Sequence, residues 1–135
     1  MFASQTGSYR SERHPGTNAS RGFDESNPLF RLIAELATLR RSHDALKHGP
    51  QIVRNYVETP GLFAVSRLDT ASGQEIVVAF NTATTALTAN IEIRPDSQKF
   101  GSLHGACEAS AAAPGSYKVT LPPLDFIVCA TSASR

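Results

Sequence analysis

The spacing of apolar residues changes once along the chain, near residue 50. Between residues 27 and 49 (NPLFRLIAELATLRRSHDALKHG) apolar side chains recur at helical spacing. After residue 50 they alternate with polar residues in short runs, and Gly, Pro, Asn and Asp punctuate these runs. This pattern predicts one long amphipathic helix followed by a mainly β segment.

The predicted helix has sharp ends and a broad apolar face. Asn27 suits the N-cap and Pro28 the first helical position, while Gly49 and Pro50 stop the helix. The apolar face covers about 180° of the helix surface, against roughly 100° in a typical surface helix. Its residues are Leu29, Phe30, Leu32, Ile33, Leu36, Ala37 and Leu39.

The remainder of the chain predicts six or seven short strands. The TASG turn between 62–69 and 74–81 predicts a β-hairpin. Strands at this spacing are typical of an antiparallel Greek-key β-sandwich. We therefore expect a polar, irregular segment at 1–26, the helix at 27–49 and a β-sandwich domain at 50–135. The strands are expected at 51–58, 62–69, 74–81, 86–93, 116–121 and 124–130, with a short one within 99–105.

The composition of the chain excludes several classes of protein. Thirteen Lys and Arg residues against twelve Asp and Glu give a net charge of +1. This charge is too small to indicate binding to nucleic acid or to an anionic membrane. The longest apolar run, IVVAF, is too short to span a bilayer. The N-terminus lacks the apolar region of a secretory signal, so the chain as written is expected to stay in the cytoplasm.

The acidic residues predict no catalytic site. The twelve Asp and Glu residues fall mostly in loops, at turn starts or on polar faces, and no pair suggests the two carboxyl groups that glycoside hydrolysis requires. The sequence contains no nucleophile elbow, no phosphate-binding loop and no dinucleotide fingerprint, so we predict no cofactor.

Two cysteines, Cys107 and Cys129, allow one disulfide, and the alternative is that both are small buried thiols. With His104 and Glu108 they form one cluster with metal-ligating side chains, but a second close pair of ligands is missing, and we predict no metal site. A bridge would fasten the loop after Cys107 to the last strand.

The order of these segments resembles the C-terminal end of α-amylase-family glycoside hydrolases. The segments are NPLFRLIAELATLRRSHDAL, PGLFAVSRLD, EIVVAFNTAT, FGSLHG and APGSYKVTLPPLDFIVCA, and MFASQTGSY is similar to the loop after the last barrel strand. The resemblance implies the last helix of a (β/α)8 barrel followed by a C-terminal β-sandwich. The family's catalytic residues come from earlier barrel strands, so none can be placed on this chain.

The resemblance implies a structural or accessory role in a starch-, sucrose- or α-glucan-acting hydrolase or transglycosylase. The chain would have no activity of its own, its partner would be the missing barrel, bound through the apolar helix face, and any contact with α-glucans would be weak. A bridge between Cys107 and Cys129 would imply an exported parent enzyme. The alternative is a stand-alone carbohydrate-binding or protein-interaction module.

Overall fold

The computed structural model describes residues 26–132, and the chain divides into two compact units, Met1–Leu39 and Arg40–Arg135. The first unit holds most of helix α2 (Pro28–Ser42), and the second holds helix α3 (Asp44–His48) and all seven strands that the structure describes. The segment predicted to be irregular, 1–26, lies outside the described residues except for its last position.

Helix α2 begins where the sequence predicts. The side-chain Oδ1 of Asn27 accepts a hydrogen bond from the backbone N–H of Leu29 at 2.9 Å, which satisfies one of the free donors of the first turn. The predicted helix 27–49 is not continuous, however, because His43 has an extended backbone (φ −127°, ψ 115°). The chain resumes as α3, whose Ala45 and Leu46 pack with an apolar cluster on β3, β5 and β7. The packing of α3 against the sheet therefore accounts for the break in the predicted helix at His43.

The strands form where the alternation of apolar residues predicts them. Their bounds are β1 (Gln51–Asn55), β2 (Leu62–Leu68), β3 (Glu75–Asn81), β4 (Leu87–Glu92), β5 (Phe100–His104), β6 (Ser116–Leu121) and β7 (Phe126–Thr131). The predicted β2–β3 hairpin is confirmed, with Leu68 paired to Glu75 at its turn. Asp69 stabilises that turn, because its carboxylate accepts hydrogen bonds from Ala71 N and Ser72 Oγ.

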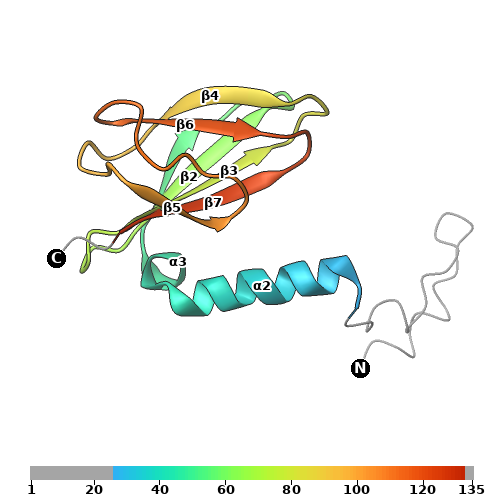
Figure 1. Cartoon of the computed structure of the whole chain (residues 1–135), viewed down its shortest axis with the longest axis horizontal. Coiled ribbons are helices and arrows are strands. Elements are labelled where there is room, and N and C mark those ends of the chain that lie inside the picture. Colours follow the sequence, from blue (N-terminus) through green and yellow to red (C-terminus); the bar gives the residue numbers. More distant parts are fainter. Residues whose placement is uncertain (1–25, 133–135) are drawn as a thin grey trace, which may run out of the picture. The chain divides into compact units, whose positions relative to one another are not determined.

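The strands build two antiparallel sheets. The larger has the order β1-β2-β3-β7-β5, and the smaller pairs β4 with β6 and lies over one face of the larger (Figure 1). The mainly β, antiparallel architecture is confirmed, whereas the Greek-key and sandwich assignments stay predictions.

The main hydrophobic core contains side chains from both sheets. Alternate residues of β2, β3 and β7 face residues of β4 and β6, as period-two alternation requires. At the centre of this core Tyr117 is fully buried and its ring lies 4.2 Å from that of Phe100, centroid to centroid. The other buried members are Leu62, Ala64, Val77, Ala79, Ile91, Ile93, Val119, Leu121, Ile127 and Cys129.

At Gly49 the end of the helical segment lies against the backbone of β2. A Cβ atom at this position would overlap the carbonyl oxygens of Leu68 and Ala45, both of which belong to the backbone. We expect Gly49→Ala to lower the free energy of unfolding by about 2 kcal/mol, since α3 must shift away from β2. Urea denaturation followed by circular dichroism measures this loss.

Gly101 supplies the matched control for that substitution. A Cβ atom built there meets no heavy atom within 4 Å. Gly101→Ala should therefore change the free energy of unfolding by less than about 0.5 kcal/mol. Equal losses in the two variants would show that the contact of Gly49 with β2 does not matter.

Candidate functional site

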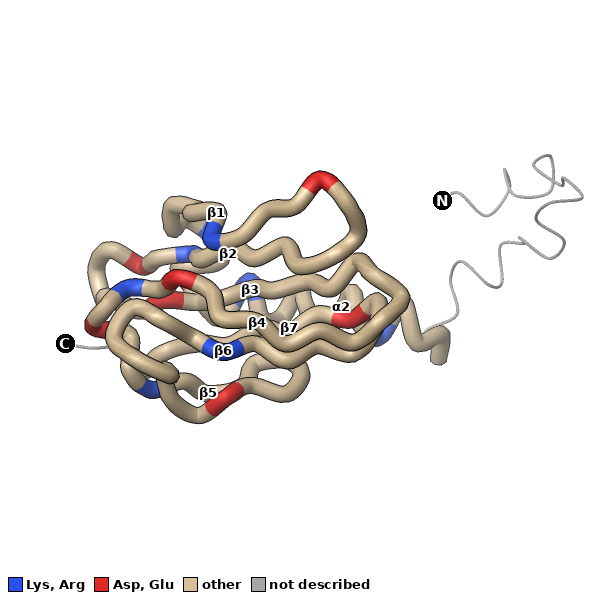
Figure 2. Tube along the Cα trace, turned by 90° about the horizontal axis from the view of Figure 1, so that it is seen from above, with Lys and Arg blue, Asp and Glu red and all other residues tan. Residues whose placement is uncertain are grey.

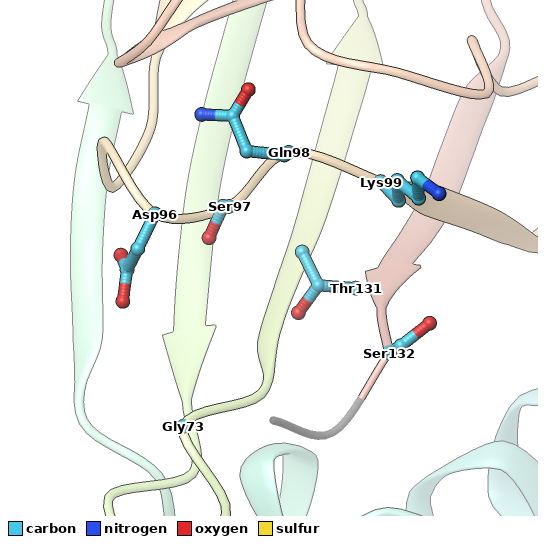
Figure 3. Close-up of a pocket in the computed structure, with 7 residues that line it drawn as sticks. All are labelled: Gly73, Asp96, Ser97, Gln98, Lys99, Thr131 and Ser132. Carbon is cyan, nitrogen blue, oxygen red and sulfur yellow. The ribbon is translucent and has the colours of Figure 1, made fainter. Parts of the chain in front are cut away.

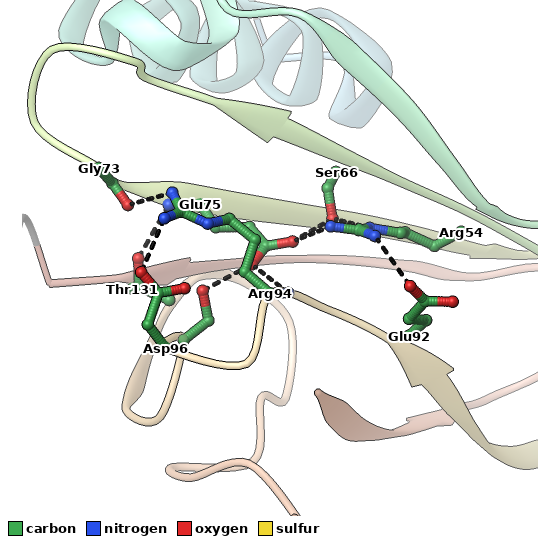
Figure 4. Close-up of polar contacts among 9 residues, drawn as sticks. Arg54, Ser66, Gly73, Glu75, Glu92, Arg94, Asp96 and Thr131 are labelled. Atoms are coloured by element: carbon green, nitrogen blue, oxygen red, sulfur yellow. Dashed lines mark hydrogen bonds and ion pairs between the residues drawn. The ribbon is translucent and has the colours of Figure 1, made fainter. Parts of the chain in front are cut away.

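The most highly bonded polar group of the described chain is the carboxylate of Glu75, at the start of β3. Its side chain is completely buried. Oε1 accepts hydrogen bonds from Arg54 Nη2 at 2.9 Å and Ser66 Oγ at 2.6 Å, and Oε2 accepts from the backbone N–H of Arg94 at 3.0 Å and Ser97 Oγ at 2.6 Å (Figure 4). We call these five residues the Glu75 cluster. It connects three strands of the larger sheet to the segment that follows β4.

Arg54 reaches this cluster because β1 is irregular at that point. The pairing of β1 with β2 shifts register between Val53 and Asn55. Such a bulge re-aims side chains and bends the strand. The Arg54 side chain is 9% exposed, and its Nε also donates to Ser66 Oγ at 2.9 Å. Its charge is thus compensated almost entirely inside the protein.

The environment of Glu75 keeps the carboxylate ionised. Burial by itself raises the pKa of Glu75, but the four hydrogen bonds to the carboxylate outweigh burial and hold this pKa below its ordinary value. A general acid needs a raised pKa, and a nucleophile needs access to substrate. The Glu75 cluster therefore has the properties of a structural ion pair that ties the sheets together.

Acid should weaken the chain through this carboxylate. Because the pKa of Glu75 is lower in the folded chain than the roughly 4.3 of an unfolded Glu, its stabilisation is complete above that value and is lost as the pH falls through the folded pKa. We expect the free energy of unfolding to fall more steeply below about pH 4.5 in the native chain than in Glu75→Gln. Urea titrations from about pH 7 to about pH 3 measure both slopes, and equal slopes would contradict the assignment.

A pocket of about 250 Å³ adjoins the Glu75 cluster, because Ser97 belongs to both (Figure 3). Two of its lining hydroxyl groups are already engaged: Ser97 Oγ donates to Glu75, and Thr131 Oγ1 accepts from the backbone N–H of Glu75 at 2.9 Å. The carboxylate of Asp96 lies 2.7 Å from Arg94 Nη2. The described lining residues are Gly73, Asp96, Ser97, Gln98, Lys99, Thr131 and Ser132. With one carboxylate among them, the pocket lacks the pair needed for glycoside hydrolysis.

The two cysteines lie together at the main core, of which Cys129 is a buried member. Cys107 and Cys129 form a disulfide, with Cα atoms 5.8 Å apart. A second tie to the same loop comes from Tyr117, whose hydroxyl donates to the carbonyl of Glu108 at 2.8 Å. Burial, reinforced by the negative charge of Glu108, raises the pKa of Tyr117 to about 12. The 105–115 loop is therefore anchored to both β7 and β6.

The cluster weighed for metal binding has other contacts in the structure. Its cysteines are bonded to each other, and the His104 ring stacks on Phe126 with centroids 4.4 Å apart. Within residues 26–132 no three or more His, Cys, Asp or Glu side chains group in a way that could hold a metal ion. In the same range no helix is long and apolar enough to cross a membrane.

Positive and negative residues of the strands and turns are interspersed rather than gathered by sign (Figure 2). Sequence reasoning listed Glu75 among twelve acids that fall mostly in loops, at turn starts or on polar faces, and did not identify its burial. A signal was present, because Glu75 shares the period-two alternation of Val77 and Ala79, which both face the core.

The chain is similar to one part of a known enzyme. The chain is 36% identical over 132 residues to an alpha-amylase of Streptomyces lividans, and the match covers 95% of this chain but 14% of that enzyme. The chain is related to α-amylase-family enzymes over one part of their length. The resemblance predicted from the sequence is thereby confirmed. No protein-family model matches the chain.

Solved structures of larger enzymes share the fold. A debranching enzyme from Nostoc punctiforme superposes with a TM-score of 0.67 at 28% identity, covering 82% of this chain and 24% of the enzyme. A variant of AmyP in complex with maltotriose gives a TM-score of 0.63 at 20% identity, covering 79% of this chain and 21% of AmyP. The α-amylase-related chain therefore matches a small portion of each of these proteins.

Proposed function

We propose that the chain forms the C-terminal, non-catalytic end of an α-amylase-family hydrolase or transglycosylase: the last barrel helix followed by an accessory β domain. The observation that carries the proposal is the match of 95% of this chain to 14% of an alpha-amylase. The Glu75 carboxylate supports the proposal. It is completely buried and accepts hydrogen bonds on both oxygens, so a sugar cannot reach it.

Helix α2 supplies the contact with the barrel in this proposal. None of its residues is buried, and Leu29, Phe30 and Ile33 are exposed by 63%, 43% and 57%. Apolar side chains exposed in a contiguous patch mark an interaction surface. The partner is the (β/α)8 barrel of the parent enzyme, and the disulfide favours a parent that is exported to an oxidising compartment.

The absence of independent activity is tested by assaying the purified chain on starch, sucrose and maltooligosaccharides. We expect no turnover above the rate without protein. The Streptomyces lividans alpha-amylase, assayed on starch in the same buffer, is the positive control. Turnover that copurifies with the chain and persists through a second purification step would overturn the proposal.

A weak contact with α-glucans is a second, separable part of the proposal. Tyr56 is 67% exposed, the most open aromatic side chain in residues 26–132, and exposed rings can stack on sugars. Titration with maltotriose, followed by NMR of backbone amides, should shift signals near Tyr56 with a dissociation constant of about 1 mM or weaker. Tyr56→Ala should abolish the shifts. Unchanged spectra at millimolar sugar would remove glucan binding from the proposal.

A further inference from the structure

The leucines of α2 follow a heptad spacing. Within the helix they occupy the a and d positions of two successive heptads, and they are Leu29, Leu32, Leu36 and Leu39. This spacing aligns the four side chains along the helix axis, and we call them the leucine seam. Within the broad apolar face of α2, the leucine seam is the narrower stripe that is typical of helices in coiled coils.

The leucine seam is not closed within residues 26–132. None of the 15 residues of α2 is buried. Leu29, at the start of the seam, is 63% exposed, and the other three leucines are half-buried. Ile33, which flanks the seam, is 57% exposed. A helix of this length is marginal in water unless its apolar face is packed. The seam therefore has room for a second helix.

The residues that flank the leucine seam carry opposite charges. Glu35 holds the g position of the first heptad, Arg40 holds the e position of the second, and both side chains are exposed. In a parallel pair of helices, each g residue faces the following e residue of the other helix. Glu35 of one copy would therefore meet Arg40 of a second copy. By symmetry the same ion pair forms twice across the seam.

The same charges disfavour an antiparallel pair. When two leucine seams overlap fully in opposite directions, g positions face g positions, and Glu35 lies against Glu35 of the second copy. Like charges destabilise a helix pair by about as much as opposite charges stabilise it. The remaining e and g positions carry no charge that could offset this repulsion, and they hold Pro28, Ile33 and Ser42. The charge pattern therefore selects the parallel arrangement.

We propose that the isolated chain forms a parallel dimer, in which α2 of one copy pairs with α2 of a second copy through the leucine seam. This inference goes beyond the proposed function and does not rest on it, because it concerns the chain without a barrel. In the parent enzyme the barrel would cover the same residues, so the two partners of α2 exclude each other. The seam is short, and we expect a dissociation constant of about 10 µM.

Sedimentation equilibrium of the full chain tests the dimer at concentrations from about 1 µM to about 1 mM. The native chain should pass from monomer to dimer within this range. Leu36→Asp places a charge in the seam and should raise the dissociation constant on the order of a hundredfold. Ala34→Asp is the matched control, because Ala34 is exposed at position f, away from the seam, and the dissociation constant should stay the same. A native chain that stays monomeric, or a dimer that Leu36→Asp leaves intact, would overturn the proposal.

An exchange of charges tests the orientation of the two helices. At low ionic strength, Glu35→Arg and Arg40→Glu should each raise the dissociation constant on the order of tenfold, since like charges then face each other at g and e. An equimolar mixture of the two variants should recover the native dissociation constant, because each chain supplies the charge that the other lacks. Recovery cannot arise from contacts within one chain. If Arg40→Glu dimerises as the native chain does, or the mixture dimerises as weakly as each variant, the parallel pair is overturned.

Amide hydrogen exchange of the native chain gives an answer that does not depend on variants folding. A dimer that binds only the helical form of α2 must slow exchange in α2 as the concentration rises through the dissociation constant. The amides of β3 and β7, which lie in the core of the β unit, are the internal reference and should not change. Equal exchange of α2 below and above that concentration would overturn the dimer. The activity assay would be unaffected, so the proposed function would stand.

Discussion

Replacing Glu75 by alanine is expected to lower the free energy of unfolding by about 4 kcal/mol, because the variant removes the buried counter-ion of a buried guanidinium. Arg54 is 9% exposed and lies 2.9 Å from the Glu75 carboxylate. The hydroxyl groups of Ser66 and Ser97 lose their acceptor at the same time. Urea denaturation of both proteins, followed by circular dichroism, measures the loss.

Glu92 provides the matched control for the loss at Glu75. Its carboxylate lies 3.8 Å from Arg54 Nη1, but its side chain is 80% exposed. An ion pair so open to water contributes at most about 1 kcal/mol, since solvent screens it. Glu92→Ala should therefore be nearly neutral. If Glu75→Ala costs no more than Glu92→Ala, burial of the ion pair does not stabilise this fold.

Removal of the Cys107–Cys129 disulfide should lower the free energy of unfolding by about 3 kcal/mol. The bond closes a loop with a sequence separation of 22, and its loss releases chain entropy in the unfolded state. Cys129 is completely buried, so the double variant Cys107→Ala and Cys129→Ala also loses some packing. Thermal and urea unfolding of the native chain, with and without reductant, measure the cross-link itself.

The double cysteine variant separates the cross-link from packing. Reductant should destabilise the native chain and leave the variant unchanged. Mass spectrometry after alkylation should find two blocked thiols only in the reduced native chain. Native protein that takes up two alkyl groups without reductant would show that the bridge does not form.

Sequence reasoning located the secondary structure well because local patterns carry that information. Period-two alternation placed the strands within a few residues of their bounds in the structure, and Asn27 with Pro28 placed the start of α2. The break at His43 was missed, since the signal for it is a contact far along the chain: Ala45 packs with Ile76 and Val128. No local pattern in 42–44 reports that contact.

The candidate site was harder to predict than the strands. The role of Glu75 depends on Arg54, Ser97 and the backbone of Arg94, which are 19 to 22 residues away along the chain. Only the pairing of the strands and the register shift in β1 bring these groups together. The pattern of Glu75, Val77 and Ala79 indicates an inward carboxylate but not its partners.

The sequence by itself determined that a helical segment precedes a series of short strands, because helical and strand periodicity are local properties of the chain. The order of these segments, and not their periodicity, indicated the resemblance to the α-amylase family. The tertiary structure decided that Glu75 is buried and that a disulfide joins the loop at Cys107 to β7. It also decided which side chains share the face of the larger sheet that is opposite β4 and β6. Those features arise from the order β1-β2-β3-β7-β5, in which strands distant in sequence become neighbours. Phe63, Phe80 and Phe126 form one row only because β7 pairs with β3 rather than with β6.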